Sequence, residues 1–268
     1  MSSDPFVQFK AAQREAWSAF APLEIFTTMP AARLVRFAGI AKGDRVLDVG
    51  CGTGVVSITA ARIGAVVQGL DLTPALLDRA RKSAAIAEVE IAFVEGDAEA
   101  LPYPNDAFDV VVSQFGHMFA PRPEVALGEM LRVLRPGGRI AFATWPPELH
   151  MGAMFSIIAR YLPAPAGPTP PAPPPLWGDP HVVRERFGSA VTDLVFDRDM
   201  MISPSLSPKH SRAMLEPTFG PLTKLVAMLE SDQPRLARLR AELEKQLEVI
   251  FADNHLKQGY LLSRATKK

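Results

Sequence analysis

The stretch from Val46 to Gly54 constrains the fold of this chain more than any other part of the sequence. A short apolar run containing one acid, Asp48, leads into glycines at three alternate positions, Gly50, Gly52 and Gly54. Glycine tolerates positive φ and lets a backbone approach a ligand closely. The residues after Gly54 have helical spacing, so the stretch predicts a buried strand, a tight turn and a helix.

The spacing of these glycines differs from that of two common phosphate-binding loops. The third glycine follows the second by two residues, whereas the dinucleotide fingerprint requires three. No Gly-Lys-Ser/Thr run follows, as a P-loop requires. The carboxylate of Asp48 just before the turn disfavours a pyrophosphate and suits a ligand with a cationic amino group.

Two further acids end predicted strands. Asp71 follows an apolar run at 65–70, and Asp97 follows another at 90–95. The carboxyl ends of parallel strands meet at the ligand-binding edge of an open α/β sheet, so we expect both acids near the glycine turn. Asp71 is placed to accept hydrogen bonds from ribose hydroxyls, and Asp97 is placed to accept one from an exocyclic amine such as that of adenine.

The periodicity along the rest of the chain alternates between strands and helices. Such alternation predicts an α/β fold with a parallel sheet covered by helices on both faces. The predicted strands lie at 45–49, 65–70, 90–95, 108–113, 139–144, 191–202 and 259–265, and the predicted helices at 31–40, 55–63, 73–87, 123–134, 149–162 and 236–250. The first thirty residues read as helical pieces punctuated by Pro22 and Pro30.

Composition excludes several functional classes. The 29 basic and 29 acidic residues cancel, which disfavours a nucleic-acid binder because such proteins need a basic face. One cysteine rules out an intramolecular disulfide and a thiolate zinc cluster. No secretory signal or run long enough to span a membrane is visible, so we expect a soluble cytoplasmic protein.

Five stretches in order carry a resemblance to a known family: Val46–Gly54, Gly69–Asp71, Glu95–Pro102, Phe108–Val111 and Arg132–Gly138. With them, the chain resembles the class I S-adenosylmethionine-dependent methyltransferases, in the type 11 group related to ubiquinone and menaquinone biosynthesis. The resemblance covers residues 45–145 and weakens beyond Trp145. It implies a Rossmann-like doubly wound sheet of seven strands, mostly parallel, with an antiparallel last strand.

The resemblance also implies an organisation and a set of cofactor contacts. Residues 1–44 would be an N-terminal helical lid, 45–145 the cofactor-binding core, and 146–268 the rest of the same domain with helical and proline-rich acceptor-pocket insertions. S-adenosylmethionine would be bound at its methionine end by Asp48, Gly50, Cys51, Gly52, Ser113 and Gln114, at its ribose by Asp71, at its adenine by Leu72, Asp97 and Ala98, and from the lid by Trp17.

Several of these residues have a second interpretation. His117, in the loop after the fourth strand, is the best candidate for a general base, or else it only shapes the pocket. Cys51 suits a small buried filler better than a nucleophile. Trp17 and Phe20 either cover the cofactor or pack between helices. The remaining histidines are scattered, so no metal site is expected.

The predicted reaction is methyl transfer to a small acceptor. The insertions between Trp145 and Leu229 are largely apolar, which favours an apolar or aromatic acceptor. The proline-rich run Pro163–Pro175 forms either a stiff wall over the pocket or a docking site for a proline-recognising domain. The helix at Leu236–Ile250 packs on the core or on a partner subunit, which leaves a homodimer open. The alternative function is a module that binds S-adenosylmethionine or S-adenosylhomocysteine either for regulation or for chemistry other than methyl transfer.

Overall fold

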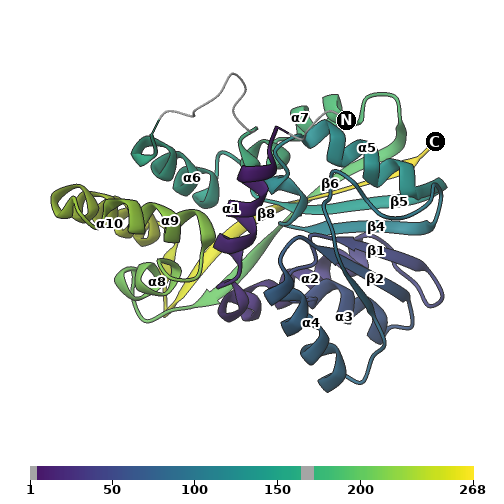
Figure 1. Ribbon diagram of the computed structural model, residues 1–268, viewed down its shortest axis with the longest axis horizontal. Helices are drawn as coiled ribbons and strands as arrows, with labels where there is room; N and C mark the ends of the chain where they lie inside the picture. Colours follow the sequence, from purple (N-terminus) through teal and green to yellow (C-terminus); the bar gives the residue numbers. More distant parts are fainter. Residues whose placement is uncertain (1–4, 164–171) are drawn as a thin grey trace.

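The computed structural model describes residues 5–163 and 172–268. Its centre is one mixed sheet with the strand order β3-β2-β1-β4-β5-β8-β6, and β7 pairs with β8 (Figure 1). The strands are β1 Arg45–Val49, β2 Val66–Asp71, β3 Ala92–Glu95, β4 Phe108–Gln114, β5 Leu134–Thr144, β6 Val191–Pro204, β7 Phe251–Ala252 and β8 His255–Lys267.

The pairing confirms the predicted Rossmann-like fold. Strands β1 to β5 pair with one another in parallel, and β8 lies antiparallel between β5 and β6. The last strand is longer than predicted, because it begins at His255 rather than Gly259. It is preceded by the short β7, which turns back through Asp253 and Asn254, both at positive φ. Asp and Asn tolerate that conformation in two-residue hairpin turns.

Helices form two layers on the sheet and a separate lobe (Figure 1). On one face lie α2 Glu24–Phe37, α3 Val55–Arg62 and α4 Pro74–Ile86, and on the other lie α5 Pro123–Val133 and α7 Pro180–Phe187. The lobe beside the sheet contains α6 His150–Tyr161, α8 Pro208–Leu215, α9 Gly220–Leu229 and α10 Gln233–Glu248. Helix α1, Val7–Trp17, stands between the lobe and the sheet.

The expected break at Pro30 is wrong, and one helix was not expected. Pro30 does not interrupt the N-terminal helices, because it lies inside α2, where Ala31, Leu34 and Val35 pack into the core. That packing outweighs the hydrogen bond that proline cannot donate. Pro180 is the first residue of helix α7, which the predicted elements do not include. Asp179 caps this helix by accepting a hydrogen bond from the His181 backbone N–H.

One hydrophobic core extends from the sheet into the lobe. The apolar face of α10, formed by Leu236, Leu239, Leu243 and Leu247, is buried against α6, α8 and α9. This face therefore packs within the chain and needs no partner subunit. Most of the proline-rich run, residues 164–171, lies outside the described residues, and Pro174–Gly178 forms a short 3-10 turn.

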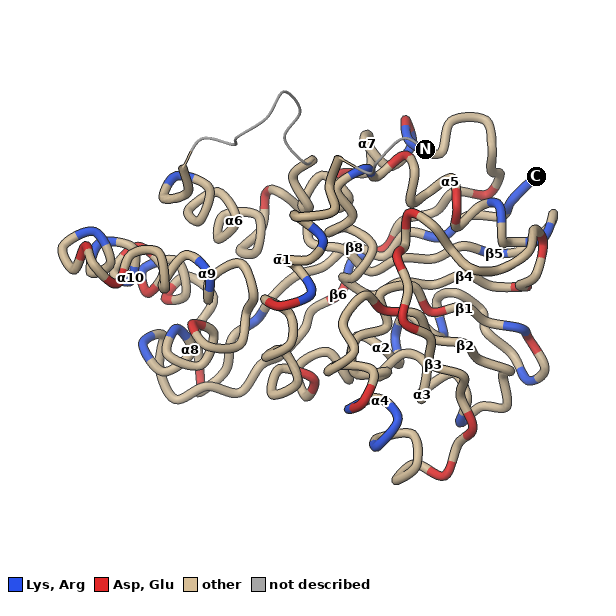
Figure 2. The backbone as a smooth tube through the Cα atoms, viewed as in Figure 1, with Lys and Arg blue, Asp and Glu red and all other residues tan. Residues whose placement is uncertain are grey.

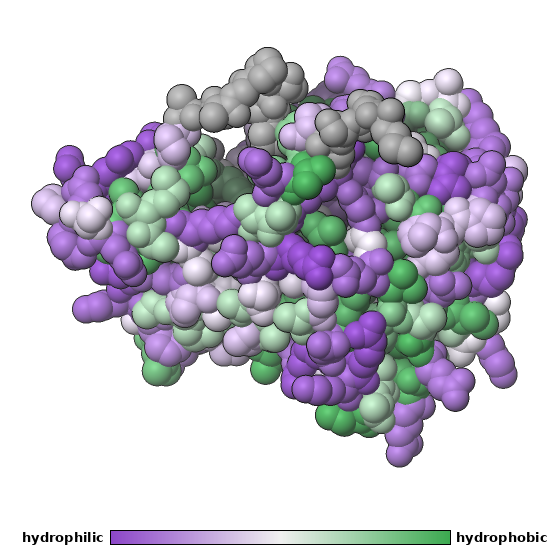
Figure 3. Space-filling view, in the orientation of Figure 1, coloured by the Kyte–Doolittle hydropathy of each residue, from purple (hydrophilic) through white to green (hydrophobic). Residues whose placement is uncertain are grey.

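Charged residues of both signs are interspersed over the described part of the chain, without a basic stripe (Figure 2). On the face seen in Figure 3, hydrophilic and hydrophobic residues also alternate over short distances. Within residues 5–163 and 172–268, no helix combines the length and the apolar character that crossing a membrane would require.

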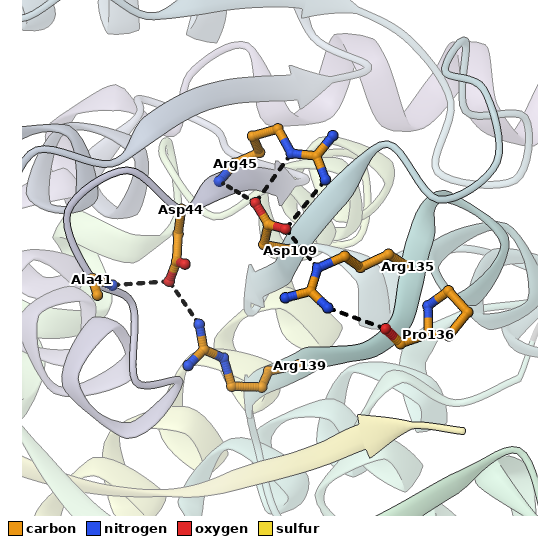
Figure 4. Close-up of polar contacts among 7 residues, drawn as sticks. All are labelled: Ala41, Asp44, Arg45, Asp109, Arg135, Pro136 and Arg139. Atoms are coloured by element: carbon orange, nitrogen blue, oxygen red, sulfur yellow. Dashed lines mark hydrogen bonds and ion pairs between the residues drawn. The ribbon is translucent and has the colours of Figure 1, made fainter.

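A charged cluster joins the amino-terminal ends of three strands (Figure 4). The Asp109 carboxylate on β4 accepts hydrogen bonds from the backbone and guanidinium of Arg45 on β1, and from Arg135 at the start of β5. These bonds, those of Arg45 first, hold the pKa of Asp109 well below its usual range. Nearby, Arg139 pairs with Asp44. The cluster lies at the edge of the sheet opposite the glycine turn.

Replacing Asp109 with Asn should lower the free energy of unfolding by about 1–2 kcal/mol, because charged hydrogen bonds to a largely buried carboxylate are lost. A carboxyl group with a lowered folded pKa stabilises the protein above its unfolded pKa and loses that effect as pH falls. The difference in the free energy of unfolding between Asp109→Asn and the unmodified protein should therefore become smaller below about pH 4. Urea unfolding at several pH values measures it. The control is Asp78→Asn, which removes an exposed ion pair with Arg81 and should change stability little; equal losses in both variants contradict the prediction.

Candidate active site

The turn after β1 exposes bare backbone to a cavity of about 240 Å³. Gly50, Gly52 and Gly54 all have positive φ, as expected for the glycine turn. A Cβ on Gly52 would meet nothing within 4 Å, whereas one on Gly50 would lie 2.9 Å from the Gly116 Cα. The loops after β1 and β4 therefore touch backbone to backbone, and Gly52 leaves room for a ligand.

Asp48 is buried at the end of β1 and lines the cavity. Its Oδ2 accepts hydrogen bonds from the Ser57 backbone N–H at 3.1 Å and from the Ser57 hydroxyl at 2.7 Å. Its Oδ1 has no partner among the described residues. Burial raises the pKa of Asp48 to about 7, against the opposing effect of Ser57. An unpaired carboxylate oxygen in this position suits a cationic ligand group.

Asp71 is the last residue of β2 and lies next to the glycine turn. Its two oxygens accept hydrogen bonds from the Gly52 and Thr73 backbone N–H groups, each at 2.8 Å. Burial raises its pKa, although these bonds oppose the shift. The Thr73 hydroxyl and the Leu72 N–H also act on this carboxylate. Because the carboxylate lines the cavity, it is placed to accept from ligand hydroxyls as well. Leu72, the next residue, also lines the cavity.

Asp97 after β3 has a partner that no sequence motif indicates. Lys10 of α1 lies 2.6 Å from an Asp97 oxygen and 2.6 Å from Glu99. Arg122 also pairs with Glu99, whose side chain is fully buried. Asp97 and Ala98 line the cavity, as expected. The ion pairs thus fasten α1 beside the carboxylate that was expected to bind adenine.

The two polar residues at the end of β4 have different positions. Gln114 lines the cavity; its Nε2 donates to the Thr27 carbonyl at 2.8 Å, and its buried Oε1 has no partner in residues 5–163 and 172–268. Ser113 does not line the cavity, contrary to expectation. Its hydroxyl donates to the Val49 carbonyl at 2.5 Å and accepts from the His117 N–H, so it ties β4 to β1 behind the cavity wall.

His117 lies at the cavity wall, with its ring inside an aromatic cluster. The ring stacks on Phe142 with centroids 4.0 Å apart and meets Trp177 edge-on at 4.6 Å. Neither ring nitrogen has a hydrogen-bond partner among the described residues. Burial, and to a smaller extent Arg186, lowers its pKa to about 3. These features favour a packing role over the expected role as a base, which remains a prediction.

Trp17 both lines the cavity and packs between helices. Its ring makes edge contacts with Phe20, Phe119 and Phe219, so α1 is joined to the lobe through an aromatic cluster. Cys51 is buried in the glycine turn, and burial raises the pKa of its thiol well above the usual value. A thiol that stays protonated is a poor nucleophile.

Beyond His117 and Trp17 the cavity becomes apolar. We call this part the chamber; its walls are Phe119, Met151, Met154, Met201, Ser203, Ser211, Met214, Leu215, Phe219, Leu256 and Gln258. Met151, Met154 and Met201 come from the insertions expected to line an acceptor pocket, whereas Met200 and Leu162 are exposed. Sequence reasoning missed Ser203 and Gln258, because only the pairing of β6 with β8 brings them here. No cluster of His, Cys, Asp or Glu suited to a metal ion occurs in the described residues.

Comparisons with known proteins agree with this geometry. A family model described as a methyltransferase domain matches residues 47–142. An uncharacterized protein of Mycobacterium tuberculosis is 37% identical over 241 residues, covering 88% of this chain and 85% of the relative. A demethylmenaquinone methyltransferase of Thermus thermophilus is 43% identical over 105 residues, covering 38% of this chain and 48% of the relative.

Among solved structures, the YcgJ protein of Bacillus subtilis superposes with a TM-score of 0.59 at 17% identity, covering 89% of this chain and 98% of that one. At this identity the likeness speaks for the fold alone. The matched domain carries the glycine turn and the strand-end acids described above. The sequence match, the shared fold and the geometry of the cavity lead to one assignment: the chain belongs to the class I S-adenosylmethionine-dependent methyltransferases.

Proposed function

We propose that this chain transfers the methyl group of S-adenosylmethionine to a small, uncharged, apolar or aromatic acceptor bound in the chamber. One observation carries the proposal: a single cavity joins a glycine turn surrounded by Asp48, Asp71 and Asp97 to the apolar chamber. The first part suits a cationic nucleoside, and the second suits an apolar molecule. The two ligands would then meet inside the protein, away from water.

The charged end of the cavity fits the cofactor. The buried oxygens Asp48 Oδ1 and Gln114 Oε1 have no donors in the described part of the chain, and an ammonium group brings three. These atoms would hold the amino group of the methionine part, while the Asp71 carboxylate would accept from the ribose hydroxyls. Asp97 with the backbone of Ala98 would bind the adenine edge. The open space beside Gly52 leaves the backbone free to approach the ligand.

S-adenosylmethionine supplies a methyl group that is already activated by a positively charged sulfur. The protein therefore has to align an acceptor atom with that methyl group and exclude water from it. Trp17 of α1, Phe119 of the loop after β4 and Phe219, just before α9, pack over the cavity. This arrangement supplies exclusion and positioning. A neutral hydroxyl acceptor also releases a proton on methylation, which would pass to solvent or to a base, and His117 is the candidate base tested below.

The chamber favours an uncharged acceptor. None of its described wall residues carries a side chain that ionises near neutral pH. An ionic acceptor would lose its hydration there without gaining a counter-ion, which is costly. The demethylmenaquinone methyltransferase relative covers only 38% of this chain, so it supports the donor more than any particular acceptor.

The direct test measures cofactor binding and methyl transfer separately. Calorimetry with S-adenosylmethionine and S-adenosylhomocysteine should give saturable binding. The loaded protein is then incubated with neutral phenols and hydroquinones, and with charged amines and carboxylates as controls, and methylated products are read by mass spectrometry. We expect methylation among the neutral aromatic compounds. Binding without transfer to any member would favour a regulatory module, and absence of binding would overturn the proposal.

Replacing Asp71 with Ala should weaken S-adenosylhomocysteine binding by about 1.5–3 kcal/mol, roughly 10- to 150-fold, because hydrogen bonds to a charged group are lost. Calorimetry measures the change, and thermal unfolding confirms that the variant is folded. Asp78→Ala is the matched control, because Asp78 lies on α4 with an exposed side chain. Unchanged affinity in Asp71→Ala means that the ribose is held elsewhere.

Cofactor binding should depend on pH through Asp48. Its raised pKa of about 7 means that a proton must leave before a cation can pair with Oδ1. The dissociation constant should therefore rise by up to about tenfold from pH 8 to pH 6. Asp48→Asn should remove this part of the dependence, while the ligand's own ionisation affects both proteins equally. Parallel pH profiles for the two proteins contradict the assignment.

Replacing His117 with Phe tests whether the ring is a base. Because the ring lies neutral among Phe142 and Trp177, we expect methyl transfer to the best acceptor of the panel to stay within about threefold. Loss of a working base would cost about 100- to 10,000-fold. Initial rates across the pH range separate the two results, and a large loss at unchanged cofactor affinity would restore the catalytic role.

A further inference from the structure

One wall of the chamber is a two-stranded ribbon that extends past the rest of the sheet. The last residue of β5 that pairs with β8 is Thr144, opposite Leu261, whereas β6 and β8 continue pairing as far as Pro204 and His255. The ribbon therefore extends beyond the carboxyl edge of the parallel strands, which is where open α/β sheets bind ligands.

Four side chains of this ribbon face the chamber, and we call them the ribbon wall: Met201, Ser203, Leu256 and Gln258. Met201 lies opposite Gln258, and Ser203 lies opposite Leu256. Alternate residues of a strand share one face. All four are buried, between 3% and 7% exposed, whereas Met200 and Ile202 on the other face of β6 are 49% and 42% exposed.

Two members of this wall are polar, and neither side chain makes a hydrogen bond to the described residues. The Ser203 hydroxyl is buried and makes no hydrogen bond with the described residues. The Gln258 side chain lines the chamber and likewise makes none to the described residues. By contrast, the Ser211 hydroxyl, also in the chamber, pairs with that of Ser205. Buried polar groups in native proteins nearly always have partners, so the unpaired Ser203 hydroxyl, with the Gln258 amide on the same cavity wall, indicates a ligand group.

We infer that Ser203 and Gln258 bind a neutral oxygen, a hydroxyl or a carbonyl, on the acceptor. The proposal rests on the proposed transfer to an apolar acceptor and names the feature that selects among such molecules. Both side chains can donate and accept, so either kind of oxygen satisfies them. No charged side chain lines the described part of the chamber, which disfavours a carboxylate or phosphate at this position. A site built for a hydrogen bond discriminates against a ligand that lacks one.

The test uses protein saturated with S-adenosylhomocysteine and two probes, para-phenylphenol and para,para′-biphenol, which differ only by a distal hydroxyl. Calorimetry should show biphenol binding about 5- to 10-fold tighter, as expected for one added hydrogen bond. The double variant Ser203→Ala/Gln258→Leu should bind both probes equally. Ile202→Ala, on the outer face of the same strand, should keep the preference. A biphenyl probe with a distal carboxylate should bind more weakly than either.

A second measurement does not depend on either probe. Because an unpaired buried hydroxyl is costly, Ser203→Ala alone should raise the melting temperature of the ligand-free protein by about 2–4 °C. Equal binding of both phenols to the unmodified protein, no binding of either at millimolar concentration, or tightest binding of the carboxylate overturns the inference. The proposed function fails separately, if the protein does not bind S-adenosylhomocysteine or methylates no neutral acceptor.

Discussion

The close approach of two backbone turns determines the geometry of the site. The loops after β1 and β4 meet at Gly50 and Gly116, where any side chain would collide with the opposite backbone. The Ser113 hydroxyl holds the same two loops together through Val49 and His117. This contact fixes the position of Asp48 relative to Gln114, and thereby places two unpaired oxygens at the same end of the cavity. An adjacent residue, Phe115, adopts a φ of 58°, which is unusual for a bulky side chain.

The cavity combines two environments that one chain must keep apart. We call the part of the cavity beside the glycine turn the nucleoside end, after the proposed cofactor. Ion pairs and backbone donors contact the acids there, so that their negative charge is stabilised although they are partly buried. In the chamber, methionines and aromatic rings provide an adaptable apolar wall. Polarity comes from Ser211, which pairs with Ser205, and from the Ser203 and Gln258 side chains of the ribbon wall. Neither environment would serve both ligands, since a charged chamber would retain water and an apolar nucleoside end would leave the cofactor's charge unpaired.

The sequence predicted the half of the molecule whose structure is encoded locally. Strands β1, β2 and β4, the glycine turn and the acids at 48, 71 and 97 follow from short motifs, and parallel topology brings their ends together. Ser113 was misplaced because its hydroxyl serves a contact between two distant strands. The burial of His117 depends on Phe142 and Trp177, which come from β5 and a segment of the insertion. Ser203 and Gln258 meet only through long-range antiparallel pairing. Helix α7, in contrast, had a readable signal in the pair Asp179-Pro180, a cap followed by a favourable first residue.

The ion pairs of Lys10 tie helix α1 to the residues that follow β3. Lys10 lies 2.6 Å from an Asp97 oxygen and 2.6 Å from Glu99. If adenine donates to Asp97, as the proposed function requires, its amine would share that carboxylate with Lys10, and Glu99 would still pair with the lysine. Trp17 of the same helix lines the same cavity. Under the proposed function, α1 would therefore contact both the cofactor site and the chamber.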